Sequence, residues 1–197
     1  LVITEKAKLL LDCGLTATPQ MWKFNPDKDF LDAIYISHWH ADHYFGLPGL
    51  LLRMWEGGRT RPVTIISQKG FRKQFKKLMD LAYIGFSEKF KFEIKITEVD
   101  AGEEIDFNDL RLIFSKTVHS GENLAIKIND GKNILAYGGD GSPMENSGFY
   151  KNLDLLILET YLYDQEKIGH SSIISAIKFS EKNNVKCLAL THMNRDF

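Results

Sequence analysis

The sequence predicts an α/β protein in which helices pack on β-sheets. Nine runs of strand length, rich in β-branched and aliphatic residues, are spread along the chain. Three helical patterns lie between these runs, which favours α/β layers over a pure β-sandwich. No repeat, low-complexity tract or linker divides the 197 residues, and 44% of them are hydrophobic. We therefore interpret 1–197 as a single domain with a sizeable core.

The predicted strands are short and end in turn residues or polar residues. One strong hairpin signal is Asp130-Gly131, which indicates a two-residue type I′ turn because that turn needs positive φ at both positions. The nine strands are KLLLD (8–12), DAIYIS (32–37), VTII (63–66), FEIKI (92–96), LRLIFSKTV (110–118), NLAIKI (123–128), NILAYG (133–138), DLLILE (154–159) and VKCLALT (185–191).

Helices are expected at LPGLLLRMWE (47–56), at 70–85 and at 171–184, the last with serines where an N-cap would stand. The chain opens on LVITEKAKLLLDCG, which resembles a hairpin already under way, and it stops five residues after His192. We expect one or both termini to lack elements of the complete fold.

Composition narrows the class of protein. The formal net charge is -1 and the pI about 6.7, so no global basic field attracts nucleic acid or an anionic membrane. No apolar run reaches the roughly 18 to 20 residues of a membrane span, and no signal-peptide pattern stands at the start. We expect a soluble, cytoplasmic protein without a membrane partner. Cys13 and Cys187 are expected to be buried free thiols rather than a disulfide.

All six histidines stand at or next to the end of a strand-like run. Three of them share the stretch SHWHADH (37–43), which directly follows the apolar run DAIYI. Asp140 follows another apolar strand and has glycines around it. Ligands carried on loops by a rigid sheet have this placement. The histidines are His38, His40, His43, His119, His170 and His192.

A pair of metal ions explains this set of residues. Imidazole and carboxylate are normal ligands of zinc and similar ions, and two ions about 3.5 to 4 Å apart can share a bridging water and carboxylate. Asp140 can supply the carboxylate, and the bridging water becomes a hydroxide source near neutral pH. Any one of these histidines alone would more often be a core or surface residue; the clustering of Asp42 with His38, His40 and His43 favours metal.

The same residues resemble a known family. HWHADH (38–43) matches the HxHxDH signature of the metallo-β-lactamase superfamily, and the continuation HADHYFGLPGLL resembles its ribonuclease Z branch. LLLDCG (9–14), GGDGSP around Asp140, LILETYL (156–162), GHSS (169–172) and LTHMNRDF (190–197) are similar to further segments of that branch, in order. The resemblance implies a four-layer αββα sandwich: two mixed β-sheets with outer helices.

The resemblance also implies a role for each residue. His38, His40 and His119 would hold one ion, Asp42, His43 and His192 the second, and Asp140 would bridge them. Asp42 would also accept a proton from the attacking water. His170 would be the general acid, oriented by Glu159, because a carboxylate beside an imidazole fixes its tautomer. Asp12 would support the ligand loop from a second layer. For Glu159 a solvent-facing strand end is the alternative.

The expected activity is metal-dependent hydrolysis, most of all of a phosphodiester, whose leaving alkoxide needs a proton. His40 stands where the flavin-associated di-iron relatives have a glutamate, which disfavours redox chemistry. Ribonuclease Z activity on precursor tRNA is the first alternative. Against it, only twenty residues separate His119 from Asp140, and a hairpin uses almost all of them, so the tRNA-gripping arm is absent there. A small or cyclic phosphodiester fits at least as well.

Several alternatives stay open. The protein could hydrolyse an ester, lactone or thioester, or be a metal- or RNA-binding module without turnover. Arg195 could bind a phosphate oxygen or be a solvated surface residue, and KGFRKQFKK (69–77) could contact RNA or simply face solvent. Zinc is the expected ion, with manganese and iron also suited. GLPGLLLRMW (46–55) could form a homodimer contact or pack in the core.

Overall fold

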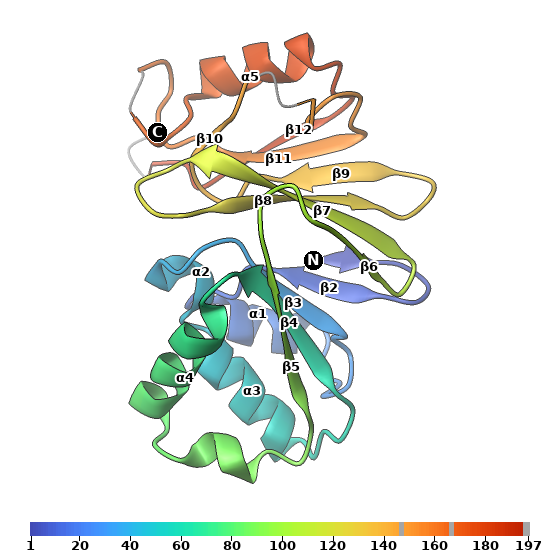
Figure 1. Ribbon diagram of the computed structural model, residues 1–197, viewed down its shortest axis with the longest axis vertical. Coiled ribbons are helices and arrows are strands. Elements are labelled where there is room, and N and C mark those ends of the chain that lie inside the picture. The colour runs from blue at the N-terminus through green and yellow to red at the C-terminus, as the bar shows by residue number, and fades with distance from the viewer. Residues whose placement is uncertain (146–147, 166–167, 195–197) are drawn as a thin grey trace. The chain divides into compact units, whose positions relative to one another are not determined.

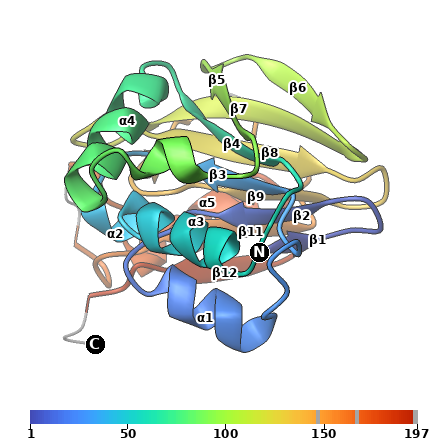
Figure 2. The ribbon, with the colours of Figure 1, turned by 90° about the horizontal axis from the view of Figure 1, so that it is seen from below.

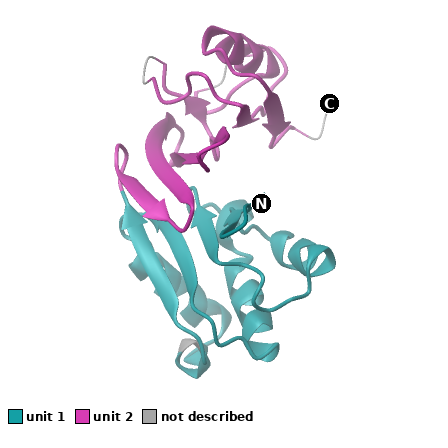
Figure 3. Cartoon of the chain, turned by 90° about the vertical axis from the view of Figure 1, so that its right-hand side faces the viewer, with its two compact units in different colours: residues 1–99 teal, residues 100–197 magenta. Residues whose placement is uncertain are grey.

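The computed structural model describes residues 1–145, 148–165 and 168–194. These residues form two compact units, Leu1–Val99 and Asp100–Phe197, which Figure 3 colours teal and magenta. Each unit contains one complete β-sheet of mixed strand direction. The expectation of two mixed sheets is therefore confirmed, and the expectation of one domain over 1–197 stays a prediction.

The first unit is built on a five-stranded sheet in the order β1-β2-β3-β4-β5 (Figure 1). β1 pairs antiparallel with β2, and the remaining pairs are parallel. Parallel neighbours require helical crossovers, which explains why helices follow β2, β3 and β4. The strands are β1 (Val2–Ile3), β2 (Lys8–Leu11), β3 (Ala33–Ile36), β4 (Val63–Gln68) and β5 (Ile94–Val99).

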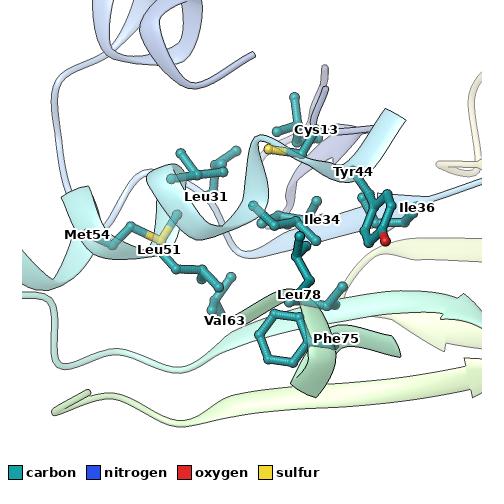
Figure 4. Close-up of a cluster of buried hydrophobic side chains, with 14 of the residues drawn as sticks. Cys13, Leu31, Ile34, Ile36, Tyr44, Leu51, Met54, Val63, Phe75 and Leu78 are labelled. Atoms are coloured by element: carbon teal, nitrogen blue, oxygen red, sulfur yellow. The ribbon is translucent and has the colours of Figure 1, made fainter. Parts of the chain in front are cut away.

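Three helices of this unit, α1, α3 and α4, lie side by side on the sheet in Figure 2. Alternate strand residues such as Ile34 and Ile36 share a core with Leu51 of α3 and Phe75 of α4 (Figure 4). This core fixes the strand ends that carry the histidine loop. The helical segments are α1 (Ala17–Phe24), α2 (Ala41–Tyr44), α3 (Leu47–Glu56), α4 (Phe71–Ala82) and the 3₁₀ turn η1 (Phe86–Lys89).

The second unit contains a seven-stranded sheet in the order β10-β7-β8-β9-β11-β12, with β6 also paired to β7. β6 to β10 form antiparallel pairs, whereas β9, β11 and β12 run parallel. The strands are β6 (Glu104–Phe107), β7 (Leu110–Val118), β8 (Leu124–Asn129), β9 (Ile134–Tyr137), β10 (Ser142–Pro143), β11 (Leu155–Glu159) and β12 (Leu188–Thr191).

Helix α5 (Ile173–Lys182) is the crossover between the parallel strands β11 and β12. Its N-terminus carries a capping box between Ser172 and Ser175, in agreement with the serine cap predicted from the sequence. Ala176 and Phe179 pack against Leu156 and Leu158 of β11. This packing holds the segment before α5, which contains His170, against the end of β11.

All nine predicted strands and all three predicted helices are present within a few residues of their expected bounds. Strand β1 lies in the hairpin expected at LVITEKAKLLLDCG, whereas β6, β10, α1, α2 and η1 are elements that the sequence did not predict. Their two to eight residues carry too short a pattern, and the pairing with β7 that makes β6 and β10 strands is a tertiary event.

Two local predictions are wrong. The β8–β9 hairpin has a four-residue loop rather than a type I′ turn, and Gly131 (φ 83°) has positive φ whereas Asp130 does not. The Asp130 carboxylate instead accepts hydrogen bonds from the backbone of Lys132 and Asn133, an arrangement that competes with the tighter turn. Both cysteines are free, but Cys187 is exposed because it precedes β12.

The predicted apolar and basic segments also have clear positions. In α3, Leu47, Leu50, Leu51 and Met54 are buried, so core packing is confirmed for these side chains and a dimer contact there stays a prediction. In α4 the aromatic residues of KGFRKQFKK face the core. No helix in the described ranges is long and apolar enough to span a bilayer.

Candidate metal centre

In the first unit, the end of β3 and the short helix α2 bring together the HxHxDH side chains. One ligand atom of His38 lies within 4.8 Å of one of His40, and the same holds for Asp42 and His43. The rings of His38 and His43 are 4.1 Å apart between centroids. His38 and His43 are buried, whereas His40 and Asp42 are exposed. The loop therefore presents imidazole and carboxylate donors at one place.

Asp12, at the end of β2, holds this loop. Its Oδ2 lies 2.6 Å from Nδ1 of His43, and its two oxygens accept hydrogen bonds from the backbone N–H and the hydroxyl of Ser37. Asp12 adopts φ 57°, a left-handed conformation that is rare outside glycine and more accessible to aspartate than to most residues. This backbone conformation directs the Asp12 carboxylate at Ser37, which directly follows β3, and at the ring of His43.

These contacts select the tautomers of the two buried histidines. Asp12 accepts the Nδ1 proton of His43, and Ser37 Oγ, which donates to Asp12, lies 3.1 Å from Nδ1 of His38 and can accept its proton. Each ring then carries its lone pair on Nε2. Ligating histidines have this arrangement, in which one nitrogen is tied to an outer partner and the other is a donor to metal.

In the second unit, three residues from separate strand ends form a similar set. His119 follows β7, Asp140 follows β9, and His192 follows β12. The carboxylate of Asp140 lies within 4.8 Å of a ligand atom of His119 and also of His192; its Oδ2 is 3.5 Å from Nε2 of His192. His119 Nδ1 lies 3.2 Å from the carbonyl of Gly169, which directs Nε2 the other way.

The loop that carries Asp140 is held by Asn123, which is buried. Its amide nitrogen lies 2.7 Å from the Asp140 carbonyl and 2.8 Å from the Gly138 carbonyl, and its oxygen is 3.3 Å from the Asp140 N–H. Gly141 has φ 88°, and a Cβ there would meet the Val118 carbonyl at 2.5 Å. Only glycine therefore fits where this loop passes the end of β7.

His170 and Glu159 form a second feature of this unit. Oε1 of Glu159 lies 3.4 Å from Nδ1 of His170 and accepts a hydrogen bond from the Ser171 N–H, while Oε2 accepts one from Tyr161. Burial raises the pKa of the Glu159 carboxyl, although these two N–H groups act in the opposite direction. Glu159 is fully buried, so a solvent-facing strand end is excluded.

The donor sets fit divalent metal ions. Nε2 of His43 stands 3.6 Å from the Asp42 carboxylate, and Nε2 of His192 stands 3.5 Å from that of Asp140. Lone-pair donors that converge in this way are suited to a cation between them, and mixed imidazole and carboxylate sets are typical of zinc, manganese and iron. Within the second unit, the Asp140 carboxylate has ligand atoms of both His119 and His192 within 4.8 Å, which is typical of the bridging carboxylate of a binuclear metal site.

The predicted site residues thus fall into two sets. Asp12, His38, His40, Asp42 and His43 come together in the first unit, and His119, Asp140, Glu159, His170 and His192 in the second. Arg195 lies outside the described residues.

Sequence reasoning missed Ser37, Asn123 and Tyr161, whose ring lies 5.1 Å from that of His170. The available signal was a polar residue at the edge of each strand run: Ser37 closes one, Asn123 opens another, and Tyr161 follows Glu159 by two.

Comparison with known proteins gives the family. A family model described as "Beta-lactamase superfamily domain" matches residues 7–193. The chain belongs to the metallo-β-lactamase superfamily. A ribonuclease Z of Methanosarcina mazei is 30% identical over 128 residues, 64% of this chain and 41% of that protein. A ribonuclease Z of Picrophilus torridus is 32% identical over 148 residues, 75% of this chain and 46% of that protein.

The crystal structure of human tRNase Z, short form, matches with a TM-score of 0.85 at 23% identity, over 99% of this chain and 85% of that chain. The metallo-β-lactamase fold expected from the sequence is therefore confirmed. The chain spans less than half the length of the two curated relatives above.

Proposed function

We propose that this chain is a metal-dependent hydrolase that cleaves phosphodiesters with two divalent ions. His38, His40 and His119 would hold one ion, Asp42, His43 and His192 the other, and Asp140 would bridge them. The observation that carries the proposal is the Asp140 carboxylate, which has ligand atoms of both His119 and His192 within 4.8 Å. A bridging ligand needs such a position, because each of its oxygens must reach a different ion.

Two bound ions would supply a water of lowered pKa and a clamp on the attacking and departing oxygens. The chain's own residues would do the rest. Asp42, whose side chain is 58% exposed, would take the proton of the attacking water. Asp12 would keep Nε2 of His43 directed at the ion through its 2.6 Å contact with Nδ1.

His170 would donate the proton that the leaving alcohol requires. A buried carboxylate 3.4 Å from Nδ1 favours the protonated imidazole and fixes the ring. Glu159 would be a positioning residue, since backbone N–H groups of Ser171 and Tyr161 hold it in place. The His119 ring, 5.6 Å from the His170 ring, puts this acid beside a proposed ligand.

Ribonuclease Z activity is the second candidate, favoured by the names of the curated relatives. Against it, β8, β9 and their short loop occupy most of the interval between His119 and Asp140, where a tRNA-gripping arm would be inserted. In KGFRKQFKK, the Arg72 guanidinium donates to the Ile96 carbonyl and the Lys76 ammonium to the Asp80 carboxylate, which leaves fewer cations for RNA. A small or cyclic phosphodiester is therefore the substrate we propose first.

Metal identity and assembly are part of the proposal. Zinc is the ion to load first, with manganese and iron as alternatives, because imidazole and carboxylate suit all three. We keep a homodimer and a cytoplasmic location as predictions.

The test is hydrolysis by the zinc-loaded full chain of bis(4-nitrophenyl) phosphate and, in parallel, of a precursor tRNA with a 3′ trailer. The Asp140→Ala variant is the blank, and metal content is measured on both proteins. We expect two ions per chain and Asp140-dependent cleavage of the small diester. Trailer removal would establish the ribonuclease Z reading. Two bound ions without any cleavage would leave a metal-binding module, and ester or thioester cleavage alone would point to the other hydrolases.

A further inference from the structure

Trp39 is not a proposed ligand, although it stands directly between two proposed ligands, His38 and His40. These three residues lie between β3 and α2, outside any helix or strand. The pairing of β3 with β4 ends at Ile36, two residues before His38. Two imidazoles that must converge on one ion therefore depend on side-chain contacts for their direction.

The three side chains of this segment separate into a pair and a single ring. The rings of His38 and His40 lie together, with centroids 4.6 Å apart, whereas the Trp39 ring packs against the core of the first unit. Successive side chains of an extended chain alternate in this way, and His40 has extended dihedrals, φ -72° and ψ 149°. A contact that fixes the Trp39 ring therefore also fixes the backbone from which both imidazoles project.

The Trp39 ring is fixed by a hydrogen bond at one end and by packing at the other. Its Nε1 donates to Oγ of Ser67 at 3.3 Å, and this fully buried hydroxyl donates in turn to the Ile36 carbonyl at 3.0 Å. The ring centroid lies 6.3 Å from that of Phe71, and a Cβ on Gly70 would meet Cη2 of the indole at 3.3 Å. The indole is thus held at its polar end by β4 and at its apolar end by the start of α4.

Asp12 supports the same loop at different residues. Its carboxylate contacts Ser37 and His43, which lie on either side of residues 38–40. Trp39 stands between these two points and is anchored to β4 and α4 rather than to β2. The loop therefore has an anchor in its middle, at the pair His38 and His40, that is separate from the Asp12 contacts.

We propose that Trp39 is a positioning residue that pre-organises His38 and His40 for one of the two ions. The inference rests on the proposed function, which assigns these two histidines to the same ion. A segment that is already fixed in its binding conformation costs little to order when the ligand arrives. Without the indole anchor, this ion has to order the segment itself and binds more weakly. The ion assigned to His43 is affected less, because Asp12 still holds that ring.

The test removes an indole at two places in the first unit. Trp39→Ala removes the anchor. Trp55→Ala is the matched control, because Trp55 is also half-buried against the same core and also donates through Nε1, to the Lys89 carbonyl, but belongs to α3 rather than to the ligand loop. Trp39→Phe keeps an aromatic ring against the core and lacks the N–H, and Ser67→Ala removes the acceptor of that N–H.

Three quantities are measured on each full-length protein. The urea midpoint records the loss of stability. Competition with a zinc chelator gives the number of bound ions and the affinity of each. The visible absorption of Co²⁺, loaded in place of zinc, reports the coordination geometry, which a loss of stability elsewhere in the core does not alter.

For Trp39→Ala we expect one of the two zinc ions to bind about 10- to 100-fold more weakly, as for other residues that support ligating histidines, and the Co²⁺ spectrum to change. Trp39→Phe and Ser67→Ala should each weaken the same ion about two- to tenfold, the net value of one hydrogen bond. Trp55→Ala should lower the urea midpoint and leave both zinc affinities and the Co²⁺ spectrum as in the parent.

Unchanged zinc affinity in a folded Trp39→Ala protein, or the same loss in Trp55→Ala, would overturn the proposal. If Trp39→Ala does not fold, Trp39→Phe and Ser67→Ala decide, and parental affinity in both would overturn it. A parent protein that binds fewer than two ions would instead refute the proposed function.

Discussion

Nδ1 of His43 lies 2.6 Å from Oδ2 of Asp12, across two neighbouring parallel strand ends. The same carboxylate accepts two hydrogen bonds from Ser37, so one side chain ties the end of β2 to the loop that follows β3. A histidine held in this way has a fixed tautomer and orientation before any metal binds.

Asp12→Asn is the first variant to make, because asparagine tolerates the left-handed conformation at φ 57° and removes the charge together with one of the two acceptor oxygens. We expect the protein to fold and to bind zinc about 10- to 100-fold more weakly, as for other outer partners of ligating histidines. Competition with a zinc chelator measures this. Asp27→Asn, on an exposed loop, is the control and should match the parent. Unchanged affinity in Asp12→Asn would remove Asp12 from the site.

Asn123→Ala tests how the bridging aspartate is positioned. The substitution removes the side-chain donor to the Gly138 carbonyl and leaves the Asp140 carbonyl with the Thr117 hydroxyl alone, at a cost of about 1–3 kcal/mol in free energy of unfolding. We expect a lower urea midpoint and weaker zinc binding, since the Asp140 loop loses its support. Asn133→Ala, on the exposed β8–β9 loop, should change neither. A loss of stability with normal zinc affinity would show that Asn123 only supports the sheet.

His170→Ala tests whether His170 protonates the leaving alcohol, by comparing two phosphodiesters whose leaving groups differ in their need for a proton. We expect dinucleotide cleavage to fall about 10²- to 10⁴-fold, the usual contribution of a general acid. Bis(4-nitrophenyl) phosphate should lose much less, because nitrophenolate departs without a proton. Equal losses on the two diesters would mean that His170 binds the phosphate rather than protonates the alcohol.

Glu159→Gln should keep the hydrogen bonds from Tyr161 or Ser171 through its remaining oxygen, but it removes the charge 3.4 Å from His170. An imidazolium without that charge loses its proton more easily. We expect the alkaline limb of the pH–rate profile for the dinucleotide to move to lower pH. A uniform drop in kcat with an unmoved profile would indicate a structural effect alone.

The two cysteines should differ in reactivity. Burial, with the charge of Asp12 beside it, raises the pKa of Cys13 to about 12, whereas Cys187 is exposed. Only the thiolate reacts, so a thiol reagent at pH 8 should modify one cysteine in the native protein and both in guanidinium chloride. Peptide mapping should find the native label on Cys187. Equal labelling of Cys13 in the native state would contradict the packing of the first core.

The candidate metal ligands of this protein can be recognised from its sequence alone. HWHADH, the histidines at strand ends and Asp140 among glycines indicate metal ligands because few other roles use imidazole and carboxylate at that density. Periodicity also predicted nine strands and the three helices of ten to twelve residues, since a pattern of that length is carried by consecutive residues. Both predictions, of the ligands and of the secondary structure, rest on residues that are close together in the sequence.

Tertiary structure decided which side chains support the site, because no local pattern in the sequence indicates them. In the sequence Asn123 looks like the start of a strand, yet in the fold its amide bonds the Asp140 loop. Gly141 looks like a turn residue, yet it is required because a Cβ there would lie 2.5 Å from the Val118 carbonyl. A cavity beside His170 combines side chains from β7, β10 and α5, which lie up to 64 residues apart in the sequence, from Val118 to Lys182. Such sites arise from the packing of distant segments, so the sequence determined which chemistry is present and the packing decided which side chains position it.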